Sequence, residues 1–439
     1  MRRGALRHLA QAALGLWLLA GAATGTSPHA AGAPARGERF DFRGGAAFPP
    51  RARVRIGDVA VPPGARAAFV PITLDRPTPN TIHARVMTRN GQFPDPALEG
   101  RHYRRLDTTV IFRPGDPLVQ TLRVALVDLP PGPSFEVHFP EGVDGAEVAD
   151  ARGRVSAAPG ARAGAAQTRG FRPPRRFVPA GAPDWVLDPP AARWSDRGGP
   201  GVFATRLPHG RTQTGNGETG LYLDPQTHRA PAAPIAVEGG ALVLRSQQLG
   251  TPIAWEGRSY RHGAAVLTGE RMPETHLTYG QVEWEAWMPD RRGSWPALWL
   301  LPVNGWPPEI DVYEGFGESP GWDFDSDISA NLHGGARGKR SFTAPLRIDA
   351  RRFYGLTGFA SGWHRYAVDI APDFITWFVD GREVYQAVNP FAGTRWFPLM
   401  NVAVKREGDY SGGNAAMRVR ALRIWRSGEG GRAAGRALR

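Results

Sequence analysis

Hydrophobic and polar residues alternate with a period of two along residues 51–157. Six alternating segments follow one another there, separated by Pro, Gly, Asn and Asp: VRIGDVAV, AAFVPITL, TIHARVMT, TTVIFRPG, TLRVALVDL and SFEVHFP. Because successive side chains of a strand point to opposite faces, each segment predicts a β-strand with one buried face. Six such strands at turn-spaced intervals predict a small β-sandwich.

A second strand-rich stretch covers residues 184–427 and is denser in aromatic residues. Its segments include VEGGALVLRSQ, YGQVEWEAWMP, WPALWLLP, WHRYAVDIAP and FITWFVDG, with almost no helical periodicity. Many short strands with Gly and Pro between them predict a large antiparallel sandwich of the jelly-roll type. The predicted fold class is therefore all-β, with a smaller N-terminal sandwich preceding the larger one.

Ala, Gly, Pro and Arg dominate the segments around the two sandwiches. This composition predicts linkers at 33–50 and 158–183 and a disordered tail at 428–439. Residues 1–32 combine a basic start, a short apolar run and a small-residue end, which is typical of a secretory signal peptide. The apolar run is short for a membrane span, and an uncleaved anchor is the alternative. We therefore expect a secreted or periplasmic protein.

The net charge and the cysteine content limit the kinds of partner and metal site that the protein can have. The formal net charge is +13, and the chain contains no cysteine. The absence of cysteine excludes disulfides and thiolate metal sites. The positive charge could favour an acidic polysaccharide. Nucleic acid is not expected, because no nucleic-acid-binding motif accompanies the scattered arginines.

Three carboxylates lie within the six residues EIDVYE, at Glu309, Asp311 and Glu314. The β-branched and aromatic residues between them predict a strand. Regular alternation would place Glu309 and Asp311 on one face and Glu314 on the other. A single β-bulge between Asp311 and Glu314 would return Glu314 to the first face, and bulges are common beside active sites. Three acids in one cleft suit a reaction that needs two carboxyls with different pKa values.

Tryptophans precede the acids on the chain. Trp295 and Trp299 are four residues apart on the preceding predicted strand, so they share one face. Indole rings stack well on the apolar faces of pyranose rings, although either residue could instead belong to the core. Trp306 lies in the loop just before Glu309, where it could also face a sugar.

The order of motifs across residues 184–426 resembles glycoside hydrolase family 16, the jelly-roll family of laminarinases, lichenases, agarases and carrageenases. The family signature E-[ILV]-D-x-x-E is matched at 309–314. Further motifs match in the family's order: Asn216-x-Glu218 with Tyr222, Tyr279-Gly280 with Glu283 and Pro289, WPALW at 295–299, Trp363-His364 with Tyr366, Val379-Asp380-Gly381 and Asn401-Val402-Ala403. The resemblance implies a concanavalin-type jelly roll that cleaves β-linked polysaccharides without a cofactor.

The resemblance also assigns roles to the three acids. It implies that Glu309 is the nucleophile, that Glu314 is the general acid/base, and that Asp311 holds the geometry between them. A retaining glycosidase needs one ionised and one protonated carboxyl, roughly 5–5.5 Å apart. The charges of Glu309 and Asp311 are expected to raise the pKa of Glu314 and keep it protonated. A solvated acidic edge strand is the alternative.

Other matched positions are expected to contact sugar. Asn216 and Glu218 would hydrogen-bond hydroxyl groups, although Glu218 could equally hold its loop. His333, in the segment SANLHGG, matches a histidine often found beside the family's acid/base. A lone histidine is also common as a structural residue.

The chain departs from the family pattern at several positions. Glu285 replaces an arginine that often contacts substrate, which predicts an altered subsite there. Lys405 and Arg406 replace a Gly-Gly pair and are expected near the cleft rim. The final strand, RVRALRIW, lacks the aspartate with which many members bind a structural calcium, so no metal site is expected there.

The N-terminal stretch resembles a Calx-beta module. The resemblance rests on the TxNG and FxPGDxxxQTLxV segments, with Phe112, Pro114, Gly115 and Asp116 in order. Most of the acids with which such modules bind calcium are missing. We therefore expect an accessory sandwich or spacer, whose deletion through about Gly181 would leave hydrolysis of soluble substrate largely intact.

Together these features predict a secreted, monomeric, retaining endo-β-glycanase. Its expected substrate is a glucan or bacterial exopolysaccharide with β-1,3 and/or β-1,4 linkages. A transglycosylase would share the same site, with a sugar hydroxyl in place of water. A non-catalytic carbohydrate-binding surface protein is the rival from another class.

Overall fold

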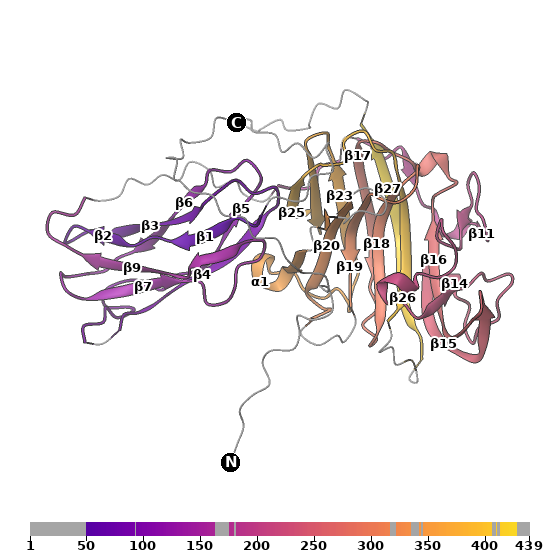
Figure 1. The fold of residues 1–439 in the computed structure, drawn as a ribbon, viewed down its shortest axis with the longest axis horizontal. Helices are drawn as coiled ribbons and strands as arrows, with labels where there is room; N and C mark the ends of the chain where they lie inside the picture. Colours follow the sequence, from indigo (N-terminus) through magenta and orange to yellow (C-terminus); the bar gives the residue numbers. More distant parts are fainter. Residues whose placement is uncertain are drawn as a thin grey trace, which may run out of the picture.

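Two all-β domains make up this protein in the computed structural model, and they lie side by side along its long axis (Figure 1). The structure describes residues 50–92, 94–162, 175–179, 181–316, 322–334, 342–343, 346–405, 410 and 413–427. The predicted all-β fold class is confirmed. Among the described residues, no helix is both long and apolar enough to cross a bilayer. Outside the described residues lie the predicted signal peptide, the linker before Pro50, positions 163–174 and 180 of the second linker, Arg406, and the tail at 428–439.

The N-terminal domain is a sandwich of two sheets. Its strands are β1 (Arg53–Ile56), β2 (Val59–Val61), β3 (Ala67–Leu74), β4 (Ile82–Asn90), β5 (Asp107–Phe112), β6 (Val119–Ala125), β7 (Ser134–His138), β8 (Glu147–Asp150) and β9 (Arg152–Ala157). One sheet has the order β6-β3-β1-β8 and the other β2-β9-β7-β4-β5. Alternate residues of β3, including Val70 and Ile72, enter the core between the sheets, as a period-two pattern requires. The resemblance of this domain to a Calx-beta module stays a prediction.

The second domain contains the remaining strands and the few short helices. These are β10 (Trp185–Val186), η1 (Pro189–Ala191), β11 (Trp194–Ser195), β12 (Phe203–Ala204), η2 (Thr214–Asn216), β13 (Gly220–Tyr222), β14 (Ile235–Glu238), β15 (Ala241–Trp255), β16 (Arg258–Thr268), η3 (Pro273–Thr275), β17 (Gly280–Trp287), β18 (Ser294–Pro302), β19 (Glu309–Glu314), β20 (Asp327–Gly334), β21 (Phe342–Thr343), β22 (Leu346–Asp349), α1 (Ala350–Tyr354), β23 (His364–Ile370), β24 (Phe374–Val379), β25 (Arg382–Val388), β26 (Trp396–Val404) and β27 (Ala415–Arg426).

Two antiparallel sheets face each other in this jelly-roll sandwich. The back sheet has the order β14-β15-β27-β17-β23-β24-β25, and the front sheet has the order β12-β16-β26-β18-β19-β20-β22. The long strands β15 and β16 also pair with each other, which joins the two sheets along one side. Consecutive strands β17 and β18 therefore belong to opposite sheets.

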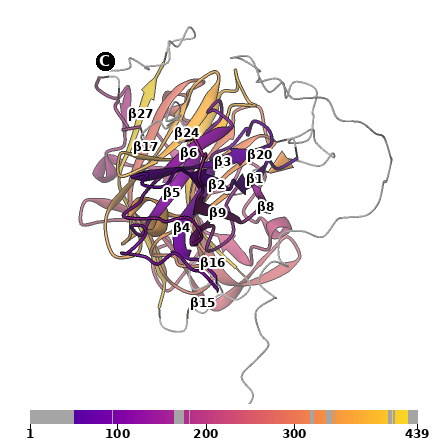
Figure 2. The same ribbon diagram turned by 90° about the vertical axis from the view of Figure 1, so that its left-hand side faces the viewer.

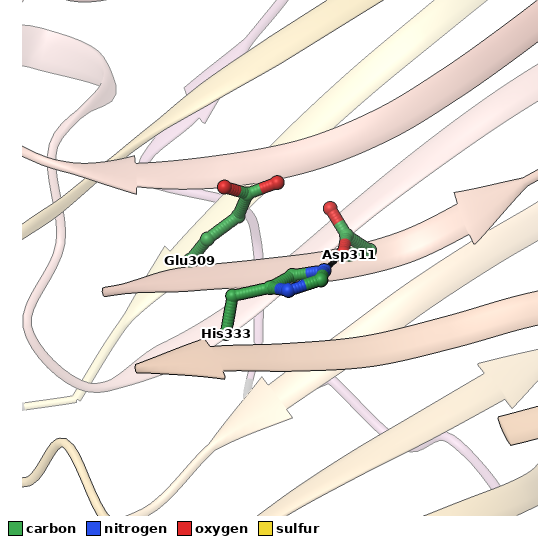
Figure 3. Close-up of side chains that lie close together, drawn as sticks. All are labelled: Glu309, Asp311 and His333. Atoms are coloured by element: carbon green, nitrogen blue, oxygen red, sulfur yellow. Dashed lines mark ion pairs between the residues drawn. The ribbon is translucent and has the colours of Figure 1, made fainter. Parts of the chain in front are cut away.

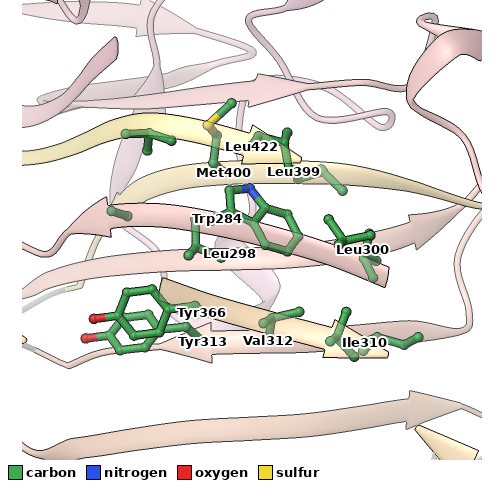
Figure 4. Packing of buried hydrophobic residues seen from close by; sticks show 14 of the residues in the cluster. Trp284, Leu298, Leu300, Ile310, Val312, Tyr313, Tyr366, Leu399, Met400 and Leu422 are labelled. Carbon is green, nitrogen blue, oxygen red and sulfur yellow. The ribbon is translucent and has the colours of Figure 1, made fainter. Parts of the chain in front are cut away.

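The core of the second domain lies between the front and back sheets. Trp284 of β17 is fully buried there, in one cluster with Leu298 and Leu300 of β18 and Ile310 and Val312 of β19 (Figure 4). Because these residues point inward, their neighbours on β18 and β19 point out of the front sheet. The outer face of the front sheet therefore carries the three acids.

The N-terminal domain and the linker cover the free edge of β25. Backbone hydrogen bonds join Thr81 to Gln386 (2.9 Å) and Val388 to Pro79 (2.9 Å), while the linker residue Arg175 accepts one from Glu383 (3.0 Å). Uncovered sheet edges are sites of aggregation, and this contact removes one. Figure 2 views the molecule from the N-terminal domain, which lies in front of the second domain.

A buried ion pair lies in the same interface between the domains. Arg113 Nε of the N-terminal domain donates to Glu383 Oε1 at 2.5 Å, and both side chains are at most 4% exposed. His83 and the Tyr354 hydroxyl share a hydrogen bond of 2.6 Å nearby. The two domains are therefore packed together through buried polar contacts, and the N-terminal domain is not a detached spacer.

Candidate active site

Strand β19 carries a bulge between its second and third acids. On the β18 side, Asp311 pairs with Trp299, and Tyr313 with Leu298, so that Val312 has no partner in the ladder. The register with β20 shifts over the same residues, from Asp311 to Glu314. The extra residue returns Glu314 to the face of Glu309 and Asp311, so the bulge predicted from the sequence is confirmed.

Glu309 lies at the start of β19 and is partly exposed. Trp306 Nε1 donates a hydrogen bond to its Oε2 at 2.7 Å. Glu309 and Asp311 project from the same side of the strand, and the His333 ring reaches toward Asp311 from β20 (Figure 3). Burial raises the pKa of Glu309 well above its usual value, and the Asp311 charge raises it further.

Asp311 is the buried member of the three, with 2% of its surface exposed. His333 Nε2 lies 3.0 Å from Asp311 Oδ2, but the geometry is not that of a hydrogen bond. Asp311 Oδ2 therefore has no hydrogen-bond partner in the described part of the chain. Trp377 Nε1 from the back sheet donates to the Asp311 carbonyl at 2.8 Å, which holds the backbone at the bulge. Burial raises the pKa of Asp311 well above its usual value, and the Glu314 charge adds to this.

Glu314 receives three hydrogen bonds from the surrounding strands. Trp295 Nε1 donates to Oε1 at 3.0 Å, while Ser329 Oγ (3.2 Å) and Asn331 Nδ2 donate to Oε2. Burial raises the pKa of Glu314, and these donors oppose the rise. Burial, rather than the charges of Glu309 and Asp311 expected from the sequence, is the cause of the raised pKa of Glu314.

All three carboxyls have raised pKa values, because burial disfavours each charge and two of them face a charged neighbour. A raised pKa favours the protonated form of a carboxyl, and a proton donor beside a second carboxyl is what general acid catalysis together with nucleophilic attack requires.

The tryptophans differ in what they can offer a ligand. Trp295 uses its indole nitrogen on Glu314, and Trp299 uses its own on Asn401 Oδ1 at 2.7 Å. Trp306 is 48% exposed beside Glu309. Of these three tryptophans, Trp306 therefore has the ring best placed to stack on a sugar.

Asn216 and Glu218 bind each other, and Glu218 lies near Glu314. Asn216 Nδ2 donates to Glu218 Oε1 at 3.0 Å, and the Asn216 side chain accepts from the Glu218 backbone. Glu218 is buried, and its other oxygen, Oε2, has no hydrogen-bond partner among the described residues. Burial raises the pKa of Glu218 to about 7, and the Glu314 charge contributes. Asn216 is exposed, whereas Glu218 is buried, binds the Asn216 side chain and lies near enough to Glu314 to feel its charge.

Sequence reasoning missed Ser329 and Asn331. Both lie on β20 opposite the bulge, two residues apart, and both contact Glu314. Their spacing in DISANLHG is the period-two signal of one strand face, so the signal was present. Only the pairing of β20 with β19 shows that this face meets the acids.

Glu285 lies on the opposite sheet from the three acids, contrary to the altered subsite predicted from the sequence. It belongs to β17 of the back sheet and binds Arg420 (2.6 Å) and Arg423 (3.4 Å). A hollow of about 340 Å³ adjoins it, lined by Phe177, Pro179, Glu283, Glu285, Arg365, Arg423 and Trp425. The front-sheet acids do not line this hollow.

Glu309, Asp311 and His333 could also hold a cation. One ligand atom from each lies within 4.8 Å of the others, and no other such group occurs among the described residues. Catalytic carboxyl pairs produce the same proximity without a metal. Activity measured with and without a chelator therefore distinguishes a metal site from a metal-free carboxyl pair.

The sequence of the second domain matches a known family. Residues 246–422 fit the family model described as glycosyl hydrolases family 16. The second domain is a family 16 glycosyl hydrolase domain. The resemblance inferred from the motifs is thereby confirmed for this domain.

Several named proteins are similar in sequence to part of this chain. Endo-1,3-1,4-beta-glycanase EglC of Rhizobium meliloti is 33% identical over 184 residues, covering 41% of this chain and 36% of the relative. Endo-1,3-1,4-beta-glycanase ExsH of the same organism is 32% identical and covers 44% and 39%. A beta-glucanase of Rhodothermus marinus is 30% identical and covers 43% and 65%. The chain thus spans less than two thirds of the length of these relatives.

Solved structures resemble the second domain more distantly. The catalytic domain of an endo-1,3-beta-glucanase (laminarinase) from Thermotoga petrophila has 21% sequence identity and a TM-score of 0.44, covering 56% of this chain and 98% of that one.

Proposed function

We propose that this chain is a secreted, retaining endo-β-glycanase that hydrolyses β-1,3 and/or β-1,4 linkages in a glucan or bacterial exopolysaccharide. The observation that carries the proposal is the bulged strand β19. It places Glu309, Asp311 and Glu314 on one face, where Trp306 donates to Glu309, Trp295 donates to Glu314 and His333 approaches Asp311. The family 16 match and the names of the relatives support the same reaction class.

Glu309 and Glu314 divide the chemistry between them. The Glu309 carboxylate attacks the anomeric carbon while Glu314 transfers its proton to the departing glycosidic oxygen, so that a glycosyl ester forms and the glycosidic bond breaks. Glu314 then takes a proton from water, whose oxygen attacks the anomeric carbon and frees Glu309. Asp311, held at the bulge by Trp377 and approached by His333, fixes the geometry between them.

The polymer class is inferred from the relatives and from the cleft. EglC and ExsH are named endo-1,3-1,4-beta-glycanases, and the third relative is named a beta-glucanase. Trp306 provides a stacking surface next to the nucleophile. The net charge of +13 favours a polymer with acidic groups, and the signal-peptide pattern of residues 1–32 supports export. We propose that the enzyme acts as a monomer.

Release of reducing ends from a panel of β-glucans, galactans and bacterial exopolysaccharides tests the reaction. Wild type is expected to cleave at least one β-1,3- or β-1,4-linked polymer, with products of unchanged anomeric configuration by early-time NMR. Replacing Glu314 with Gln removes the general acid/base and is expected to lower kcat by about 10²–10⁴-fold, and Glu309→Gln at least as much. Equal rates for wild type and Glu309→Gln would refute the mechanism.

The same assay separates the alternatives. Longer products that accumulate at high oligosaccharide concentration would identify a transglycosylase. Oligosaccharide binding without turnover would identify a carbohydrate-binding protein instead. Loss of activity in a chelator, restored by a divalent cation, would assign Glu309, Asp311 and His333 to a metal.

A further inference from the structure

Two carboxyl groups and one imidazole meet at a single point on the front sheet. One ligand atom from each of Glu309, Asp311 and His333 lies within 4.8 Å of the others (Figure 3). Glu309 and Asp311 belong to β19, and His333 is the partner of Glu309 in the ladder with β20. The backbone positions of all three residues are therefore fixed by paired strands rather than by a loop.

The contact between His333 and Asp311 is close without being a hydrogen bond. His333 Nε2 lies 3.0 Å from Asp311 Oδ2, and this oxygen has no hydrogen-bond partner among the residues that the structure describes. Asp311 is only 2% exposed. A buried carboxylate oxygen of this kind calls for a water or an ion as its partner.

The geometry of this contact fits two ligands of one ion. Zinc lies about 2.0–2.1 Å from an imidazole nitrogen and about 2.0–2.2 Å from a carboxylate oxygen. With the nitrogen and the oxygen 3.0 Å apart, an ion at those distances from both lies at about 45° to the line that joins them. A nitrogen whose lone pair faces such an ion does not face the oxygen, so the contact is short without being a hydrogen bond.

Glu309 can join this pair as a third ligand while it keeps its own contact. Trp306 Nε1 donates to Glu309 Oε2 at 2.7 Å, and a carboxylate has lone pairs for a further partner. Trp377 holds the backbone of Asp311 at the bulge. Partners of this kind orient the ligands of metal sites. Glu309 and the His333 side chain are both partly exposed, so an ion can reach them from solvent.

The three donor groups select the kind of cation. Two carboxylates supply the charge that balances a divalent ion, and imidazole suits zinc, copper and nickel. Calcium and magnesium prefer oxygen ligands. The combination of groups therefore favours Zn²⁺ over Mg²⁺ and Ca²⁺.

We propose that Glu309, Asp311 and His333 form an inhibitory site for a divalent transition-metal ion such as Zn²⁺. This inference rests on the proposed glycanase function, in which the Glu309 carboxylate must reach the anomeric carbon. An ion bound to that carboxylate blocks its attack, so the metal-bound enzyme does not cleave the polymer. Hydrolysis belongs to the metal-free enzyme, which is therefore expected to be fully active in a chelator.

Isothermal titration calorimetry of the full chain with ZnCl₂ measures the site without relying on activity. Wild type is expected to bind Zn²⁺ at a site that His333→Gln and Asp311→Asn each weaken at least tenfold. MgCl₂ at the same concentration should show no such binding. His364→Gln is the matched control and should bind like wild type, because His364 lies on the back sheet beside a single carboxylate, with Nδ1 2.8 Å from Asp380 Oδ2. Should one of the two site variants fail to fold, the other decides.

Hydrolysis measured over the same range of ZnCl₂ links the site to the reaction. At substrate concentrations below KM, the wild-type rate should halve at the Kd found by calorimetry and fall about tenfold at ten times that concentration. Excess EDTA should restore the rate in full. His333→Gln should need at least tenfold more Zn²⁺ for the same fractional loss of its own rate, whereas His364→Gln should match wild type.

The two proposals fail differently. Absence of a Zn²⁺ site in calorimetry, equal binding by wild type and both site variants, or full hydrolysis with the site saturated would overturn the inhibitory site and leave the glycanase intact. Loss of activity in a chelator would overturn it too, since the metal would then support the reaction. Zinc binding without hydrolysis of any polymer would overturn the glycanase function and the inhibitory role with it.

Discussion

The ion pair between Arg113 and Glu383 predicts that the two domains stabilise each other. Glu383 is 2% exposed, and its two oxygens bind the Arg113 side chain (2.5 Å) and the Arg175 backbone N–H (3.0 Å). Glu383→Ala would remove the buried carboxylate that binds the Arg113 side chain and the Arg175 backbone N–H. Breaking a buried pair in this way costs about 3–5 kcal/mol. For domains of this size, that corresponds to a fall in Tm of about 10 °C.

Differential scanning calorimetry of the full chain measures this effect. Glu383→Ala is expected to melt about 10 °C below wild type. The double variant Arg113→Met with Glu383→Leu replaces both charges with apolar groups, so it should recover to within about 1 kcal/mol of wild type. Arg76→Met is the surface control, since its pair with Asp75 is largely exposed and is worth at most about 1 kcal/mol.

Two results would contradict this reasoning. If Glu383→Ala melted like Arg76→Met, the interface would be solvated in solution. If the double variant were as unstable as Glu383→Ala, the loss would come from packing or from the Arg175 contact rather than from the broken Arg113–Glu383 pair. Each result would reject the broken pair as the cause of the instability.

Three pH-dependent predictions follow from groups with shifted pKa values. Folding raises the pKa of Glu218 from 4.5 to about 7, so the folded state is stabilised at low pH and loses that stability as pH rises through this range. Glu218→Gln should therefore make Tm depend less on pH between 4.5 and 7. Burial and then the Arg113 charge lower the pKa of His83 from 6.5 to about 3, so stability is lost as pH falls from 6.5 toward 3; Tm of His83→Gln should fall less over that range. Asn331→Ala removes a donor to ionised Glu314 and should raise its pKa, moving the basic limb of the kcat/KM profile to higher pH, and an unmoved limb would reject Glu314 as the acid.

Strand β19 was predictable because its signals are local. Period-two alternation, the odd spacing between Asp311 and Glu314, and the need for one common face together imply a bulge. The bulge appears in the register of β19 with both neighbours. A prediction of this kind depends only on residues adjacent in the chain.

The features that the sequence did not reveal depend on residues far apart in it. Arg113 and Glu383 are 270 positions apart, and an arginine among 54 basic residues carries no sign of being buried. Glu285 was misplaced because sequence order does not show that β17 and β18 belong to opposite sheets. The cause of the raised pKa of Glu314 was missed for the same reason, since burial is a property of the packed sheets.

The covered edge of β25 changes what deletion of the N-terminal domain should do. Deletion through Gly181 removes the segments around Thr81 and Arg175 that hydrogen-bond to this strand, and it exposes Glu383. A long bare edge invites pairing with another chain, so we expect aggregation in light scattering and lower activity. A chain that begins at Arg175 keeps the linker contacts and should aggregate less. A truncated chain that stays monomeric with wild-type Tm and kcat would support the accessory domain predicted from the sequence. It would also show that the buried contacts add little to the fold of the second domain.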